Sequence, residues 1–232
     1  MARYRQLAAE TGLWLSLGGF QESGAPPREH GGGGGGGVNT LGPPTPRIHN
    51  THVLLDSSGA TVAAYRKVHL FDAESLTESA STAPGRALAA AQSPAGALGL
   101  SVCFDLRFPE FYQALAFQHG VRVLAVPAAF TPATGEAHWE LLLRARAVET
   151  QCAVVAAAQA GTHNARRASH GHAMIVDAWG RVVARLSDPH ATGIAVADLG
   201  DAAVEAVRAR MPLAAARARG RAALGWPPDV PA

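Results

Sequence analysis

The stretch Leu98-Gly99-Leu100-Ser101-Val102-Cys103-Phe104-Asp105-Leu106-Arg107-Phe108-Pro109-Glu110 decides the fold. Its apolar first half is typical of a buried strand, and Pro109 with Glu110 indicates a helix start, because proline fits the first helical position and a carboxylate favours the positive end of the helix dipole. Cys103 therefore lies in a strand-to-helix connection. A buried cysteine is often a small core residue, but the charged, turn-forming residues after Cys103 favour a reactive thiol at a strand end.

Strand and helix patterns alternate on both sides of this stretch. Residues 4–11 predict a helix and residues 13–19 a short buried strand, while the runs 50–56 and 61–67 flank Ser57-Ser58-Gly59 and predict a β-hairpin that delivers Lys67 near a strand end. Further strands are expected at 121–126, 153–159, 171–177, 181–185 and 193–198, and helices at 138–152 and after Asp198. The alternation predicts a layered α/β fold, with residues 1–232 as a single domain.

Two segments depart from this pattern. Residues 23–46 are rich in Gly and Pro, with seven consecutive glycines at 31–37, and predict a disordered surface insertion. A phosphate-binding loop is not favoured, because the glycine tract ends in Val38-Asn39-Thr40 instead of Gly-Lys-Ser/Thr. The Ala/Arg-rich tail from about residue 208 is expected to be irregular.

Several segments resemble the signature motifs of the nitrilase superfamily of carbon-nitrogen hydrolases. The stretch from Cys103 to Glu110 is similar to the superfamily's nucleophile motif, and Tyr65-Arg66-Lys67-Val68-His69-Leu70-Phe71 to its lysine motif. The resemblance continues through 137–151, 156–159 and 171–180, where the detail looks like the deaminated-glutathione amidase branch. It implies a four-layer αββα sandwich lacking its first strand, a homodimer and no cofactor.

The resemblance also implies a mechanism. Cys103 would attack a carboxamide carbon, and Lys67 with the backbone N–H of Phe104 would stabilise the oxyanion, with Lys67 also serving as proton donor. The implied reaction hydrolyses deaminated glutathione to 2-oxoglutarate and cysteinylglycine through a thioester, as metabolite repair. The alternative within the family is an ω-amidase acting on 2-oxoglutaramate.

The third member of the family's triad is a general-base glutamate in an early strand-end motif, and we expect this chain to begin after that motif, N-terminally incomplete. The glutamate is therefore predicted to be absent, which leaves a catalytically impaired homologue as a further alternative. Glu10 is interpreted as a surface helix residue. Glu78, which matches a supporting glutamate of the family, is predicted either to support Lys67 or to be a solvated loop carboxylate.

Three other residues are candidates near the nucleophile. His138 and Glu140 open a helix beside the expected pocket and are assigned supporting roles, with a His138–Cys103 dyad as the alternative to the triad. Arg107 is predicted to bind a substrate carboxylate by bidentate hydrogen bonding, or to form a structural pair with Asp105 or Glu110.

The remaining features exclude other classes of function. His163, His170 and His172 are interpreted as structural, because no cysteine or carboxylate set at ligand spacing accompanies them, and no metal is expected. Cys152 is predicted to be an inert core thiol, and Trp139 and Trp179 to be core or pocket wall. Neither nucleic acid nor membrane is an expected partner, and the location predicted is cytoplasmic, with mitochondrial targeting left open.

Overall fold

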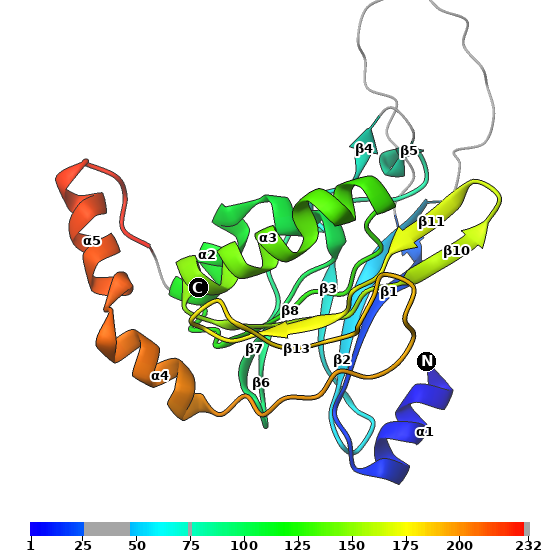
Figure 1. The fold of residues 1–232 in the computed structure, drawn as a ribbon, viewed down its shortest axis with the longest axis horizontal. Coiled ribbons are helices and arrows are strands. Elements are labelled where there is room, and N and C mark those ends of the chain that lie inside the picture. The colour runs from blue at the N-terminus through cyan, green and yellow to red at the C-terminus, as the bar shows by residue number, and fades with distance from the viewer. Residues whose placement is uncertain (26–46, 74–75, 230–232) are drawn as a thin grey trace, which may run out of the picture.

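The computed structural model describes residues 1–25, 47–73 and 76–229, and most of its strands form two sheets (Figure 1). Of the predicted insertion, Ser23 to Ala25 belong to strand β1, and residues 26–46 lie outside the described residues. No helix in the described ranges has the length and apolarity that a membrane span requires.

The smaller sheet has three antiparallel strands in the order β1-β2-β3 (Leu15–Ala25, Arg47–Leu55 and Thr61–Arg66). The predicted hairpin that ends at Lys67 is thus confirmed. Side chains alternate between the faces of a strand, and β2 uses both faces. Val53 and Leu55 pack with Ala8 of helix α1 (Ala2–Thr11), while Leu54 joins the larger core on the other face.

The larger sheet has six strands in the order β13-β12-β9-β8-β7-β6. These strands are Val182–Arg185, Met174–Val176, Ala153–Ala156, Val123–Ala125, Gly96–Leu100 and Ala90–Ser93. The three central strands β7, β8 and β9 are parallel, and the flanking strands are antiparallel. The carboxyl ends of β7 and β8 therefore meet at one edge, where Leu100 and Ala125 lead toward Cys103 and Pro127.

Helices α2 (Pro109–Phe117) and α3 (Pro132–Thr150) cover the face of the larger sheet that points away from the smaller sheet. The layers therefore run from α1 through the two sheets to α2 and α3, which is the predicted αββα sandwich. Thr131 caps α3 by accepting a hydrogen bond from the Thr134 N–H, so this helix begins earlier than the predicted 138.

Several predicted elements differ from the structure. Residues 193–198 alternate in burial as a strand does, yet no ladder partner pairs with them among the described residues. The helix predicted after Asp198 is present as α4 (Asp201–Arg210). The tail from about residue 208, expected to be irregular, contains a second helix, α5 (Leu213–Ala223), because alanine and arginine both favour helix. Short elements not predicted are β4, β5 and η1 (Asp72–Ala73, Leu76–Thr77, Glu78–Ala80), strand β6, and the hairpin of β10 and β11 (Ala160–Asn164, Arg167–His170).

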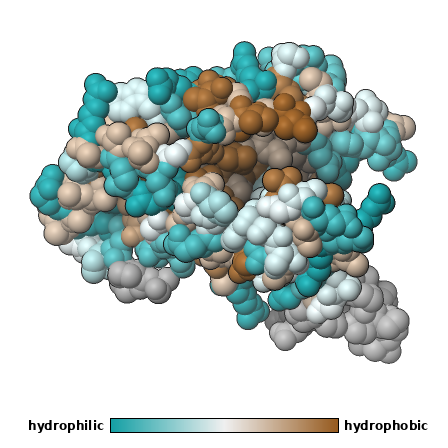
Figure 2. All heavy atoms as spheres, turned by 90° about the horizontal axis from the view of Figure 1, so that it is seen from below, coloured by the Kyte–Doolittle hydropathy of each residue, from teal (hydrophilic) through white to brown (hydrophobic). Residues whose placement is uncertain are grey.

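Hydrophobic surface gathers on the face seen from below the molecule of Figure 1, in a hollow bordered by polar side chains (Figure 2). The extended segment 191–199 carries two strongly exposed β-branched residues, Ile194 and Val196, at 87% and 80% exposure. Ile194 and Val196 therefore leave apolar surface that no other described residue covers.

His52 of β2 joins the two sheets at the core. Its Nδ1–H donates to the Ser101 carbonyl oxygen at 2.8 Å, and its Nε2 accepts from the Ser16 hydroxyl at 2.8 Å. Burial disfavours the imidazolium and lowers the pKa of His52 from 6.5 to about 4. The ring is therefore neutral in the folded protein at physiological pH.

Acidification is expected to destabilise the fold through His52. The unfolded chain binds the proton more readily, so the free energy of unfolding falls as pH drops from about 6.5 to about 4, by on the order of 3 kcal/mol. Urea unfolding across this pH range measures the slope. His52→Asn should remove it and the exposed-site control His190→Asn should keep it; equal slopes in both variants would contradict this assignment.

Candidate active site

Cys103 begins the short 3-10 helix η2 (Cys103–Arg107), which follows β7 and precedes α2. Its backbone has a φ of +50°, a left-handed conformation that is uncommon for a residue with a side chain and that recurs at functional sites. The Cys103 N–H donates to the Pro127 carbonyl oxygen at 2.9 Å, which ties the turn to the end of β8. The thiol is half-buried at the carboxyl edge of the parallel strands, in the predicted strand-to-helix connection.

Close backbone packing surrounds this turn. A Cβ added to Gly18 of β1 would lie 2.0 Å from Pro127 Cγ, so only glycine allows β1 to approach the segment that holds Cys103. A Cβ on Gly85 would lie 2.0 Å from the Arg66 carbonyl oxygen, and the Gly85 N–H donates to the Lys67 carbonyl oxygen at 2.8 Å. Glycines therefore fix the backbone on both sides of the site.

Lys67 follows β3 and is buried, with 3% of its side chain exposed. Its Nζ donates to Glu78 Oε2 at 2.6 Å, and that oxygen also accepts from the Phe71 N–H at 2.8 Å. Glu78 Oε1 accepts from Asn50 Nδ2 at 3.1 Å. Of the two interpretations left open for Glu78, the structure therefore favours the residue that contacts Lys67 over the solvated carboxylate.

Opposing effects act on the Cys103 thiol. Burial raises the pKa of Cys103 above its ordinary value because a thiolate is poorly solvated there, while the positive charge of Lys67 and a hydrogen bond from the Ala129 backbone lower it. The negative charges of Glu78 and Asp105 raise it further. Among these effects, the positive charge of Lys67 is the largest that favours the thiolate.

Neutralising Glu78 should destabilise the protein. Glu78→Gln leaves the buried Lys67 ammonium without its counter-ion, and we expect the free energy of unfolding in urea to fall by about 3 kcal/mol. The matched control is Glu22→Gln, because Glu22 pairs with Arg66, the residue before Lys67, in a far more exposed position. The control should cost less than about 1 kcal/mol; equal losses in the two variants would mean that the buried pair has no special weight.

Arg107 lies at the end of η2, with its guanidinium over the rings of Phe104 and Phe130 at 5.9 and 5.5 Å. Both terminal nitrogens donate to His138 Nδ1 at 3.3 Å. The structural alternative, a pair with Asp105 or Glu110, is wrong, because among the described residues Arg107 forms no ion pair with either. His138 contacts Arg107, and the described hydrogen bonds include none between His138 and Cys103.

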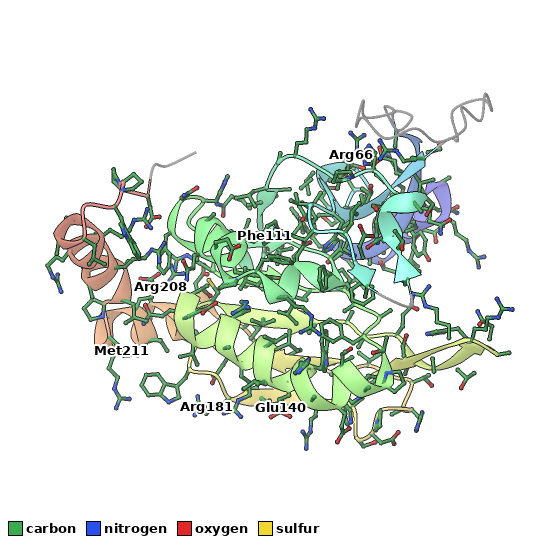
Figure 3. The ribbon with its side chains drawn as sticks, turned by 90° about the horizontal axis from the view of Figure 1, so that it is seen from above. Arg66, Phe111, Glu140, Arg181, Arg208 and Met211 are labelled. Atoms are coloured by element: carbon green, nitrogen blue, oxygen red, sulfur yellow. The ribbon has the colours of Figure 1, made fainter. Side chains whose placement is uncertain are left out.

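The structure does not bring Glu140 to the site, contrary to the prediction. Its carboxylate lies near Arg144 at 3.6 Å and Arg185 at 3.3 Å, on the side of α3 that also faces Arg181 (Figure 3). Side chains two positions apart on a helix point about 200° apart. His138 and Glu140 therefore cannot both face Cys103.

The other sequence candidates lie apart from this site. Glu10 is exposed on α1 and accepts from Gln6 Nε2 at 2.7 Å, as expected of a surface helix residue. Cys152 is fully buried, and burial raises the pKa of its thiol. Trp139 is a core residue, whereas Trp179 is exposed and contacts Arg210.

His170 and His172, interpreted as structural from the sequence, do not share a strand. β11 ends at His170, and His172 has a φ of +56°, although the two rings lie 5.1 Å apart. No group of three His, Cys, Asp or Glu side chains that could hold a metal occurs in the residues that the structure describes.

Sequence reasoning missed Asn50 and Asp105. Asn50 is hydrogen-bonded to Glu78, and its Oδ1 is buried without a partner among the described residues. Asp105 is fully buried and hydrogen-bonded to both Tyr65 and His69. Each contact joins residues at least 28 positions apart, and the only available signal was that Asp105 is a carboxylate two residues after the candidate nucleophile.

Comparisons with known proteins agree with this arrangement. Residues 1–209 match the carbon-nitrogen hydrolase family. The human protein named deaminated glutathione amidase is 52% identical over 205 residues, which are 86% of this chain and 58% of the human one. The chain therefore spans less than two thirds of that relative.

Solved structures give the same result. The crystal structure of the Caenorhabditis elegans NitFhit protein superposes with a TM-score of 0.77 at 40% identity, over 91% of this chain and 48% of the other. A glutamate-to-glutamine mutant of a Nesterenkonia amidase superposes with a TM-score of 0.67 at 26% identity, over 91% and 70% of the two chains. In that structure the acetamide moiety of fluoroacetamide is added covalently at the active-site cysteine. The protein thus belongs to the carbon-nitrogen hydrolase family.

Proposed function

We propose that this protein is an amidase that hydrolyses deaminated glutathione to 2-oxoglutarate and cysteinylglycine. The observation that supports it most is the half-buried Cys103 at a strained strand end, under the positive charge of the buried Lys67. The 52% identity to the human deaminated glutathione amidase supports the choice of substrate.

In this proposal the Cys103 thiolate attacks the γ-amide carbon of the substrate. The carbonyl oxygen takes the negative charge, and Lys67 Nζ with the Phe104 N–H stabilises it; the first N–H groups of a helical turn have no partner within that turn. Collapse of the tetrahedral intermediate breaks the carbon–nitrogen bond, Lys67 donates a proton to the departing amine of cysteinylglycine, and a thioester remains on Cys103. Water then attacks the thioester, which releases 2-oxoglutarate and the thiol.

Arg107 supplies the second recognition element of this proposal. Its guanidinium is held by His138 and by two aromatic rings, without a carboxylate partner among the described residues. A guanidinium in this state suits the planar carboxylate of a 2-oxo acid, which it binds by paired hydrogen bonds. The ω-amidase substrate 2-oxoglutaramate carries the same carboxylate, so the assay must compare the two amides.

The substrate assignment predicts a split between amides with and without a carboxylate. Arg107→Gln is expected to lower kcat/KM for deaminated glutathione by about 10- to 100-fold, because the paired hydrogen bonds to the substrate carboxylate are lost. Any hydrolysis of butyramide, an amide without a carboxylate, should be lowered much less. The control is Arg181→Gln, an exposed arginine paired with Asp177. Formation of 2-oxoglutarate measures the hydrolysis of both deaminated glutathione and 2-oxoglutaramate. A higher kcat/KM for 2-oxoglutaramate would make that amide the proposed substrate. An equal loss of activity on butyramide in Arg107→Gln would refute the role of Arg107.

A second candidate is the catalytically impaired homologue. One observation that favours it is the exposed position of Glu10. The other is that, within the described ranges, the oxygens of the Glu78 carboxylate are already hydrogen-bonded to Lys67, Phe71 and Asn50. Under this alternative Cys103 would acylate and the thioester would persist, because no base activates water. Product formation over many turnovers would exclude it.

The cytoplasmic location, with mitochondrial targeting left open, and the homodimer remain part of the proposal. Exposed apolar residues on α3 and the adjacent turn, among them Leu141, Val148 and Trp179, support a partner surface. Light scattering of the purified chain would give the mass of a dimer if the proposal holds.

A further inference from the structure

We propose that Asp105 is a positioning residue, whose carboxylate fixes the Cys103 turn against the Lys67 segment. This inference rests on the proposed roles of Cys103 and Lys67, and it assigns a function to a buried carboxylate that the proposed chemistry does not use. Asp105 is fully buried, where an ionised group is stable only if hydrogen bonds replace its hydration.

Both oxygens of Asp105 are engaged, and each donor belongs to one of the two segments. Oδ2 accepts from the Val102 N–H at 2.8 Å and from the Tyr65 hydroxyl at 2.8 Å. Oδ1 accepts from the His69 N–H at 3.2 Å and from His69 Nδ1 at 2.8 Å. An ionised carboxylate only accepts, so Nδ1 carries the proton of the His69 ring.

The donors bracket the two proposed functional residues. Tyr65 and His69 lie on either side of Lys67, and the Tyr65 hydroxyl also accepts from the Val68 N–H at 3.0 Å. Val102 and Asp105 lie on either side of Cys103. One carboxylate therefore sets the position of the Lys67 backbone relative to the Cys103 backbone.

Packing and strain agree with a positioning role. The His69 ring stacks on Phe108 at 3.7 Å and meets Phe111 edge-on at 5.7 Å, so its Nδ1 is held in one direction. The positive φ of Cys103 persists only if its surroundings over-determine it. The bond from the Val102 N–H to Asp105 and the bond from the Cys103 N–H to Pro127 supply that constraint.

Charge and geometry predict opposite results for Asp105→Asn. The negative charge of Asp105 raises the pKa of Cys103, so a role limited to charge predicts that its removal yields more thiolate and faster alkylation. Loss of positioning predicts the reverse, because the turn no longer holds the thiol beside Lys67. The amide N–H2 group of the asparagine would face groups that themselves donate hydrogen bonds to Asp105. The sign of the change therefore separates the two roles.

The test is the rate at which iodoacetamide alkylates Cys103 from pH 6 to 10, followed by peptide mass spectrometry, which counts Cys152 separately. Tyr65→Phe should slow alkylation at pH 7.5 about tenfold, equivalent to a rise of about one in the pKa of the thiol. The matched control is Tyr112→Phe, since Tyr112 is as buried and donates to Ser101 Oγ at 2.9 Å without joining the two segments. The control should stay within about twofold of wild type.

A second pair of variants covers the case in which Tyr65→Phe does not fold. An asparagine at position 69 can place a donor where His69 Nδ1 lies, so His69→Asn should retain the wild-type pH profile and His69→Leu should shift it upward. The proposal is overturned if folded Tyr65→Phe is alkylated at the wild-type rate at every pH. If Tyr65→Phe does not fold, the same result for His69→Leu overturns it. Faster alkylation of Asp105→Asn overturns it in either case. Iodoacetamide probes only the thiol, so this result stands whether or not the chain hydrolyses deaminated glutathione.

Discussion

Cys103→Ala is expected to abolish the formation of 2-oxoglutarate from deaminated glutathione, with a loss of at least about 10⁴-fold in kcat. The physical reason is that the alanine methyl group cannot form the thioester, and attack by unactivated water must then replace a covalent step. A stopped assay of 2-oxoglutarate measures the loss.

The control for this variant is Cys152→Ala. Cys152 is a fully buried thiol whose sulfur contacts the Val121 carbonyl oxygen and Arg208, and it should be dispensable for the reaction. A Cys103→Ala protein that folds and retains activity within tenfold of wild type would remove Cys103 from the mechanism.

Lys67→Met should have the second largest effect, because it removes both the proposed oxyanion donor and the charge that favours the thiolate. Loss of one oxyanion donor costs about 10²–10³ in kcat, and the higher pKa of the Cys103 thiol adds to it. We expect the rate of 2-oxoglutarate formation to fall by roughly 10³-fold or more. The same variant leaves the largely buried Glu78 carboxylate without its counter-ion, which should destabilise the fold by about 3 kcal/mol.

A double variant separates these two consequences. Lys67→Met with Glu78→Gln removes the unpaired charge, so the free energy of unfolding should recover relative to Lys67→Met alone, whereas the catalytic rate should not. Recovery of the rate together with stability would show that Lys67 acts through folding only.

Local sequence patterns predicted much of the fold. The apolar run before Cys103, the Pro-Glu helix start and the Ser-Ser-Gly turn are encoded within a few residues, and the corresponding β7, α2 and β2–β3 hairpin are present. The strand expected at 193–198 has the right alternation, but a strand also needs a ladder partner, which a local pattern cannot supply. The β10–β11 hairpin was missed because its polar residues lie at the surface, where no apolar alternation is needed.

The candidate site was predictable to a smaller extent. Lys67 and Cys103 stand in motifs that resemble a family, so their positions could be named from the chain alone. The contact between Lys67 and Glu78 depends on how the loop after Phe71 folds, and the sequence left it open. The bonds of Asp105 to Tyr65 and His69 depend on the packing of two segments that are distant in the chain. Glu140 does not lie at the site, because its position on α3 directs its carboxylate toward Arg185.

The proposed role of Cys103 as the nucleophile of an amidase is tested most directly by intact-protein mass spectrometry of the chain, quenched in acid during reaction with deaminated glutathione. We predict a covalent adduct with the mass of 2-oxoglutarate less one water, located on the peptide that contains Cys103 and absent from Cys103→Ala. Product formation without any adduct in wild type, and at the same rate in Cys103→Ala, would contradict it.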